Sequence, residues 1–423
     1  MLDEKKGFHY AKLMKIWLKF LIGSVLGLIA GGLLPSDNQN IMEALIWLER
    51  LAIGIGRYAL VPMVLFSLTI AVHELRQDSK FWPLVFQSII VIVCCAALVI
   101  GLGILVTLLF SPSRIPILIE EQIEMVFLDT QDKILELFPY NMFRALTGDG
   151  TYLLPVYVFA FFLGLGLSYD RNYTKPVISM IDSLSRIFYH VASFFSEILA
   201  LVMISLSVYW SIRFHAVLRA EMFRDLIVLL IVFSLVLIFG IFPFLLYFTK
   251  PKANPWLVLY GSLGQGLAGF FSGDINFTMP VAFRHVKENL GVQRRSNSLT
   301  LSLFTIFGRS GSAMTAAASF IVIINSYSSL GITTSDIITI ATQAFLISFL
   351  LARNPGDGAY TALAALCLAY GRGYEAGYLI LRPLAFFLIS IGTFLDVMIA
   401  SFASYFIARF NKYQEDKRPK HFI

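Results

Sequence analysis

Charged residues are scarce in this chain, and their scarcity excludes an ordinary soluble protein. Only 14% of the 423 residues are Asp, Glu, Lys or Arg, whereas 57% are hydrophobic and the mean hydropathy is +0.75. Soluble domains carry about 25% charged residues. Because helices satisfy their own backbone hydrogen bonds in lipid, this composition predicts an all-α polytopic membrane protein.

Cysteine is also scarce, with only Cys94, Cys95 and Cys367 in the whole sequence. None of the three has the spacing of metal ligands, so we expect them to be small buried hydrophobes. The formal net charge is +6, but the basic residues fall in short runs between apolar stretches, where they set membrane topology. Nucleic acid is therefore excluded as a partner.

Apolar windows of about 20 residues, long enough to cross a bilayer, fill the first part of the chain. The first window follows a basic segment that superficially resembles a signal peptide. It has no obvious cleavage site and further spans follow, so we expect a retained helix. The windows lie near 14–34, 46–73, 82–110, 152–168, 188–212 and 225–248.

Beyond Pro251 the apolar stretches are interrupted by glycine, proline and charge. Two interruptions, Gly273–Pro280 and Arg353–Gly358, divide apolar segments into halves too short to span alone. Broken segments in corresponding positions point to a transporter binding site, because half-helix termini leave free N–H groups and partial positive charge inside the membrane. We predict a repeat of re-entrant hairpin plus full helix: hairpin 1 at 255–291, helix seven at 299–325, hairpin 2 at 336–371 and helix eight at 377–410.

The basic runs predict the orientation of the chain. Lys and Arg precede the first window, follow the second, fourth and sixth, and end the chain in a charged tail at 411–423. By the positive-inside rule both termini are cytoplasmic, and the acidic segment 120–129 lies outside. Arg213, Arg219 and Arg224 break the pattern.

Arg309 lies inside LFTIFGRSGSAMTAAASFIVII, a segment otherwise apolar enough for the membrane interior. A guanidinium at that depth costs roughly 2.5–3.5 kcal/mol on insertion scales, so it needs a partner or an aqueous cavity. The small residues beside it loosen the helix and free backbone groups that only a protein-lined cavity can satisfy. A helix-end arginine reaching the interface is the alternative. We interpret Arg309 as a functional residue.

Several strings resemble the dicarboxylate/amino acid:cation symporters, the family of the glutamate transporter homologues. LAIGIGRYALVPMVLFSLTIAV is similar to the second helix of that family, and LFPYNMFRALTGDGTYLLPVYVFAFFLGLGL to its fourth-helix region. FTMPVAFRHVKENLGV resembles an arm of its first hairpin, and NPGDGA the tip of its second. The resemblance implies eight transmembrane helices, two re-entrant hairpins, inverted repeats and an elevator mechanism.

The same resemblance divides the chain and implies an assembly. Residues 1–250 are mainly scaffold and trimerisation helices, although the third span near 82–110 could belong to the moving unit. Residues 251–410 form the transport core. A homotrimer in the inner membrane of a bacterial cell is expected, contacting lipid and a small solute.

The chain departs from this family where the chemistry should lie. A serine-rich hairpin tip is replaced by Gly273–Phe277, and the sodium-coordinating Asn-Met-Asp-Gly-Thr motif corresponds to Gly308–Ser312. Of the polar group in the last helix only Asp396 remains. Two positive charges about 4 Å apart repel by roughly 4 kcal/mol at an effective dielectric near 20, or about three decades of affinity. We therefore expect sodium coupling to be weakened or lost, with Arg309 replacing the cation and pairing with Asp396 or Asp357.

The hairpin tips, helix seven and helix eight supply the predicted solute site. Arg353 either caps its hairpin or grips a solute carboxylate, while Asp357 and Asp274 either satisfy a helix dipole or carry a coupled proton. Asn276 and Thr278 either cap or donate to solute. The predicted solute-binding residues are Asp274, Asn276, Thr278, Arg309, Ser310, Ser312, Arg353, Asn354, Pro355, Gly356, Asp357, Gly358 and Asp396.

No cofactor is expected, and the coupling ion is Na⁺ or H⁺, with Na⁺ disfavoured. A residual sodium site would use Asp396 and Gly308. The sequence predicts a secondary transporter of an acidic amino acid or dicarboxylate. The alternatives are a carrier of a non-acidic or larger solute, uncoupled or proton-coupled, and an anion channel. A fourth reading is an intramembrane serine protease, since Gly308–Gly311 forms a Gly-x-Ser-Gly string, although the only later histidine is His421.

Overall fold

The computed structural model describes residues 14–35, 39–116, 137, 139–148, 150–169, 171–218, 221–249, 254–327, 332–419 and 422–423. Every regular element within them is a helix, apart from one isolated bridge between Val292 and Gln414. Seven helical stretches among these residues are long and apolar enough to cross a membrane. The prediction of an all-α protein with many membrane spans is confirmed. The acidic segment 120–129, Arg219 and His421 lie outside the described residues.

The N-terminal part differs from the predicted spans in two places. The window near 46–73 is divided at Tyr58–Ala59, because Pro62 has no N–H to donate to the Tyr58 carbonyl and its ring would clash with that carbonyl in a continuous helix. The window near 188–212 is the middle of one helix of 48 residues. The elements are α1 (Ile16–Leu33), α2 (Gln39–Arg57), α3 (Leu60–Gln77), α4 (Phe81–Phe110), η1 (Met142–Leu146), α6 (Leu154–Leu167), α7 (Arg171–Leu218), η2 (Glu221–Phe223), α8 (Arg224–Leu235), the π-helical η3 (Val236–Ile241) and α9 (Phe242–Thr249).

The C-terminal part consists of helix pairs separated by short breaks. Asn254 caps the first helix, Gly273 ends it with a positive φ of 61°, and Asp274 caps the next. The predicted interruption is therefore confirmed at Gly273, although Pro280 lies inside a helix. The elements are α10 (Pro255–Ser272), α11 (Ile275–Glu288), α12 (Arg294–Phe307), α13 (Ser310–Tyr327), α14 (Thr334–Ser348), η4 (Leu351–Arg353), α15 (Gly358–Tyr370), η5 (Gly377–Leu384) and α16 (Ala385–Phe410).

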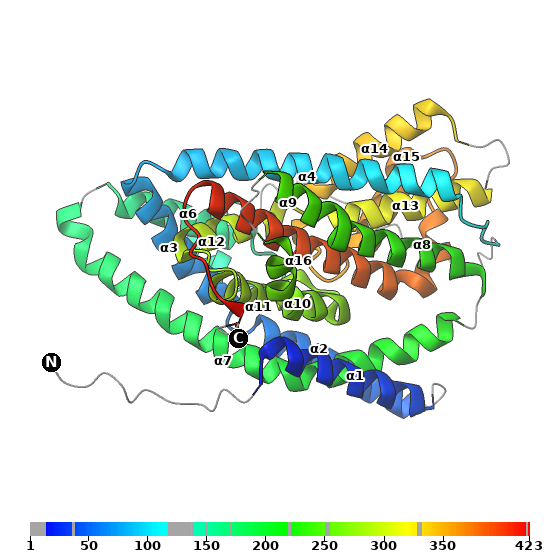
Figure 1. The fold of residues 1–423 in the computed structure, drawn as a ribbon, viewed down its shortest axis with the longest axis horizontal. Helices are drawn as coiled ribbons and strands as arrows, with labels where there is room; N and C mark the ends of the chain where they lie inside the picture. Colours follow the sequence, from blue (N-terminus) through cyan, green and yellow to red (C-terminus); the bar gives the residue numbers. More distant parts are fainter. Residues whose placement is uncertain are drawn as a thin grey trace.

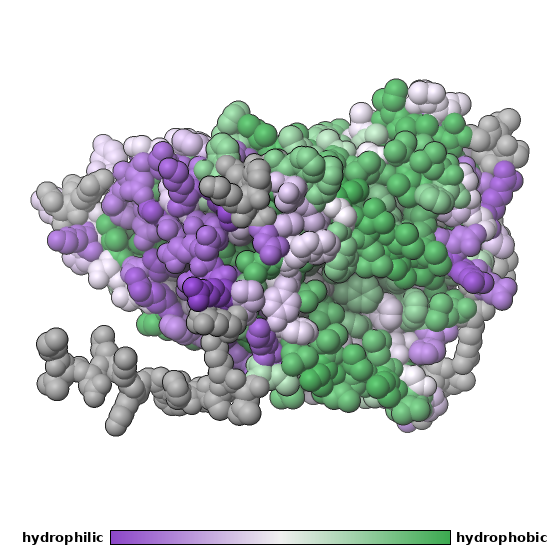
Figure 2. All heavy atoms as spheres, in the orientation of Figure 1, coloured by the Kyte–Doolittle hydropathy of each residue, from purple (hydrophilic) through white to green (hydrophobic). Residues whose placement is uncertain are grey.

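The helices are arranged around the C-terminal part (Figure 1). α4 runs along one edge of the molecule and α7 along the opposite edge, with α1 and α2 packed on α7. α13 and α16 lie between these edges, and α10 packs against α16. Figure 2 shows an apolar region over the centre and right of this face, between a broad hydrophilic left end and a narrower hydrophilic right margin. Such a belt between polar ends is the surface that a membrane-embedded protein needs.

The prediction that all three cysteines are buried is wrong for Cys94 and Cys95. Cys367 is buried, but Cys94 is exposed and Cys95 is only partly buried. α4 is apolar on its outer face as well as its inner one, so an apolar neighbourhood in the sequence did not distinguish lipid-facing positions from core positions. Cys94 therefore lies on the surface that faces hydrocarbon.

Glycines bring α1 and α7 into close contact. Gly23, Gly27 and Gly31 recur every four residues on one side of α1 and are buried. A Cβ atom on Gly27 would lie 2.0 Å from Ser207 Oγ and 2.3 Å from the Ile204 carbonyl oxygen. This is the small-residue packing that lets transmembrane backbones approach each other.

Replacing Gly27 by leucine is expected to lower the stability of the protein by about 3 kcal/mol, the upper end of overpacking costs, because the Ile204 carbonyl belongs to the backbone and cannot turn aside. Thermal unfolding in detergent measures the effect. Gly32→Leu is the matched control in the same helix, since its nearest neighbour is the His215 ring at 3.7 Å. Equal unfolding temperatures for the two variants would contradict the contact.

Candidate functional site

Arg309 lies in a break between two halves of one long helical segment. α12 ends at Phe307 and α13 begins at Ser310, so Gly308 and Arg309 lie outside helical geometry. The Arg309 side chain is 0% exposed, and its Nε donates to Asp396 Oδ2 at 2.8 Å. Asp396 is also 0% exposed. Arg309 therefore forms a fully buried ion pair with α16.

Asp396 also satisfies the first N–H groups of α13 from a neighbouring helix. Its Oδ1 accepts from Gly311 N at 2.7 Å and Ser312 N at 3.1 Å, while its Oδ2 accepts from Ser312 Oγ at 2.6 Å. A carboxylate at this position matches the unsatisfied donors and the positive end of the helix dipole. A Cβ atom on Gly311 would lie 2.4 Å from Leu395 Cβ, so the approach of α13 to α16 requires glycine there.

The Arg309 guanidinium also touches the break between α14 and α15. Its Nη1 lies 3.5 Å from the carbonyl oxygen of Asn354, and its Nη2 lies 3.4 Å from Ser312 Oγ. A Cβ atom on Gly358 would lie only 2.2 Å from Nη2. Glycine at the start of α15 therefore makes room for the arginine.

The break between α10 and α11 meets the break between α14 and α15. Ile275 N, just after the first of these breaks, donates to the carbonyl oxygen of Pro355 in the second at 3.1 Å. Thr393 Oγ1 of α16 donates to the Gly273 carbonyl at 2.9 Å. Gly356 lies so close to Asp274 that an added Cβ would be 3.1 Å from its Oδ2. The structure thus brings the two predicted hairpin tips into contact with each other, and the first of them is bonded to α16.

Asp274 has two roles in this arrangement. Its Oδ1 accepts from Phe277 N at 2.8 Å as the cap of α11, and its Oδ2 forms an ion pair with Arg57 at the end of α2. Asp274 is 1% exposed. Asp274 therefore fits the capping interpretation, whereas Thr278 Oγ1 donates to the Asp274 carbonyl at 2.8 Å, the bond to residue i−4 that threonine often makes within a helix.

A second contact joins the same tip to the segment before α6. Asn276 Nδ2 donates to the carbonyl oxygens of Gly150 and Thr151, each at 3.0 Å, and Arg57 Nη1 donates to Thr151 Oγ1 at 3.3 Å. Sequence reasoning missed Arg57. The sequence could have indicated it, because Arg57 lies within the apolar window near 46–73. A guanidinium there carries the same free-energy cost as Arg309 and needs a partner for the same reason.

Arg353, Asp357 and Ser310 take no part in the ion pair between Arg309 and Asp396. Arg353 and Asp357 are exposed, and no contact joins Asp357 to Arg309 among the described residues. Ser310 is 1% exposed, and its Oγ has no hydrogen-bond partner within the described chain. Of the two partners considered for Arg309, the structure selects Asp396.

Two polar cavities flank the tips. One of about 230 Å³ is bordered by Glu49, Arg213 and Asp357, together with Tyr209 and Tyr360. The other, of about 780 Å³, shares Glu49 and Asp357 and adds Arg50 and Arg57 from α2. Glu49 and Arg213 were not predicted, because their apolar neighbours gave no motif. Charged groups of α2 and α7 thus face the tips across open space.

The arrangement fits a resident cation poorly. In the described part of the chain, no group of three or more His, Cys, Asp or Glu residues could hold a metal ion. Both oxygens of Asp396 already accept hydrogen bonds, and the guanidinium beside them is positively charged. A hard cation needs several free oxygen ligands. The proposed residual sodium site at Asp396 and Gly308 would have to displace Arg309.

Comparison with known proteins decides the family. Residues 16–410 match the Sodium:dicarboxylate symporter family. The chain belongs to this family. It is therefore a multi-pass membrane protein of a transporter family, and the protease interpretation of Gly308–Gly311 is wrong.

Individual relatives match this chain over a shorter stretch than the family as a whole does. Excitatory amino acid transporter 1 of Homo sapiens is 29% identical over 124 residues, 29% of this chain and 22% of the relative. Excitatory amino acid transporter 2 of Homo sapiens is 29% identical over 138 residues, 32% of this chain and 24% of the relative. An excitatory amino acid transporter of Caenorhabditis elegans is 28% identical over 124 residues, 29% of this chain and 24% of the relative. The matched part spans about a quarter of the length of these relatives.

Proposed function

We propose that this symporter-family member is a secondary transporter of a small organic solute, an acidic amino acid or dicarboxylate, with sodium coupling weakened or lost. The observation that carries the proposal is the Arg309–Asp396 pair, 0% exposed on both sides. A tethered guanidinium supplies the positive charge that a bound ion would bring to the start of α13. The amino acid transporters among its relatives support the solute class.

The buried pair supports the proposed loss of a cation at this place. An uncompensated carboxylate inside a protein is costly, and Asp396 receives its countercharge at 2.8 Å from Arg309. A sodium ion entering within about 4 Å of the guanidinium would meet a repulsion of roughly 4 kcal/mol at an effective dielectric near 20. Arg309 therefore excludes the ion whose structural role it takes.

The proposed mechanism is an elevator with α10–α16 as the moving unit. The meeting tips, the α13–α16 contact and the Arg309 pair tie these elements together. The helices before residue 250 form the scaffold, arranged as a homotrimer with both termini cytoplasmic. In that arrangement the contact between Arg57 and Asp274 crosses the boundary between scaffold and moving unit.

The solute site would lie at the tips, where Gly356 and Asp357 border both cavities and Asp274 borders the larger one. Arg50 and Arg213 border these cavities and offer guanidinium groups to a solute carboxylate. Asp357 borders both cavities and is the proposed carrier of a coupled proton. A non-acidic or larger solute remains the second carrier hypothesis, since Glu49 and Asp357 place negative charge in the same space.

Uptake into proteoliposomes tests the proposal. We expect radiolabelled L-aspartate, L-glutamate or succinate to accumulate at rates that differ less than two-fold between an inward sodium gradient and an inward choline gradient, because Arg309 replaces the ion. An imposed proton gradient shows whether protons drive uptake instead. Strict dependence on sodium would contradict the proposal, and an ohmic, solute-independent anion current would replace the carrier by a channel.

A further inference from the structure

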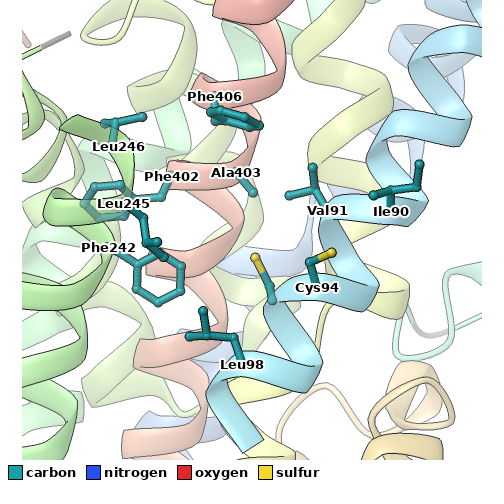
Figure 3. A pocket seen from close by; sticks show the side chains of 11 residues that line it. Ile90, Val91, Cys94, Leu98, Phe242, Leu245, Leu246, Phe402, Ala403 and Phe406 are labelled. Atoms are coloured by element: carbon teal, nitrogen blue, oxygen red, sulfur yellow. The ribbon is translucent and has the colours of Figure 1, made fainter. Parts of the chain in front are cut away.

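A groove of about 340 Å³ lies where α4, α9 and α16 meet, away from the tips. Figure 3 shows side chains from the three helices around it, with Phe242 and Leu245 of α9 facing Leu98 of α4 across α16. Its volume is within the usual range of ligand pockets, about 300–1,000 Å³. The side chains that border the groove include Ile90 and Cys94 of α4, Leu245 of α9, and Phe402, Ala403 and Phe406 of α16.

The lining is hydrocarbon in character. Apart from the thiols of Cys94 and Cys95, every side chain that borders the groove is aliphatic or aromatic. A polar ligand would lose its hydrogen bonds to water there without replacement. The occupant must therefore be an apolar chain or ring.

The mouth of the groove is continuous with the outer surface of the membrane-spanning helices. Ile90 is 45% exposed and Leu245 is 37% exposed at its edges. Beyond them, Phe86 on α4 and Phe244 on α9 are exposed apolar side chains. At this position on helices long enough to span a bilayer, the surrounding medium is lipid hydrocarbon. Acyl chains therefore reach the groove directly.

One end of the groove becomes polar and basic. Asn411 Nδ2, just beyond α16, donates to Gln87 Oε1 of α4 at 2.5 Å, about one turn from Ile90 and Phe406. Lys412 is exposed next to this amide pair. A phosphate head group prefers basic side chains near the membrane surface. The groove thus presents an apolar channel with a positively charged end.

We propose that this groove holds one acyl chain of a membrane phospholipid, with its phosphate near Lys412. The chain would lie between α9 and α16 and fill space that protein side chains leave open. The π-helical η3 directly precedes α9 and sets the rotation at which Phe242 and Leu245 face the groove. Inserted π segments of this kind occur often at functional sites.

Lipid retention measured by native mass spectrometry tests the site, using protein purified from vesicles of phosphatidylethanolamine and phosphatidylglycerol. Ala403→Phe fills the groove from its floor, and Cys94→Trp fills it from its mouth at an exposed position. Each variant is expected to retain one phospholipid fewer per chain than the unmodified protein. Cys94→Trp decides the matter if Ala403→Phe fails to fold.

The matched control is Ala97→Trp, an exposed position on α4 that does not border the groove. It should retain as much phospholipid as the unmodified protein. Lys412→Ala should reduce the preference for phosphatidylglycerol over phosphatidylethanolamine about five-fold, because a basic residue near the surface contributes about 1 kcal/mol toward anionic lipid. Unchanged retention in both groove variants, or equal loss in Ala97→Trp, would overturn the proposal. An unchanged lipid preference in Lys412→Ala would overturn the placement of the head group.

Discussion

Replacing Arg309 by methionine should abolish transport and lower the free energy of unfolding by about 3–5 kcal/mol, the usual cost of breaking a buried ion pair from one side. Methionine fills part of the volume but leaves Asp396 at 0% exposure without a countercharge. The remaining donors, Gly311 N, Ser312 N and Ser312 Oγ, reduce this cost but carry no full positive charge. Denaturation in detergent and solute uptake measure the two effects.

The companion variants separate charge from packing. Adding Asp396→Asn to Arg309→Met removes the uncompensated charge, so the double variant should recover most of the lost stability. Transport should stay lost, because the tethered positive charge is still missing. Arg353→Met repeats the substitution at an exposed position and should leave unfolding nearly unchanged. An Arg309→Met protein that unfolds and transports as the unmodified chain does would show that the pair has no such role.

Replacing Arg57 by methionine is expected to lower the free energy of unfolding by about 3 kcal/mol. Asp274 would remain buried without its countercharge, and the lower end of the range applies because the Arg57 side chain is 18% exposed. Asp274→Asn should cost less, about 1 kcal/mol, since asparagine caps a helix as well as aspartate does and Arg57 can reach water. Thermal unfolding in detergent, compared for the two variants, measures the difference.

Arg50→Met is the control for this pair, because Arg50 lies on the same helix and borders the same larger cavity. Its unfolding temperature should stay within about a degree of that of the unmodified protein, as for most exposed substitutions. If Arg57→Met were as harmless as Arg50→Met, the ion pair would not be what stabilises the tip. The cap alone would then explain the role of Asp274.

The positions of the helix breaks could be predicted because their causes are local. Glycine at 273 permits a left-handed backbone, Asp274 is a strong cap, and the sequence Asn354–Gly358 combines proline with two glycines. Each of these signals acts within a few residues of where the helix ends. The break at Tyr58–Ala59 was missed, because a single proline inside an apolar window was read as part of a continuous helix.

The partners of the buried charges could not be predicted in the same way. Arg309 and Asp396 lie 87 residues apart, and Arg57 and Asp274 lie 217 apart. The free-energy cost of a buried charge indicates that a partner exists. Which residue that partner is depends on which helices pack together. Asp357 was an equally good candidate for Arg309 by charge, and only the packing of α13 against α16 distinguishes the two.

The pair between Arg309 and Asp396 also has a thermodynamic consequence. A covalently attached guanidinium has no chemical potential of its own outside the protein, so no concentration difference can perform work through it. The pair carries zero net charge, whereas each uncompensated charge crossing the membrane would gain or lose about 2.3 kcal/mol per 100 mV. Any accumulation of solute against its own gradient would then have to be driven by another ion.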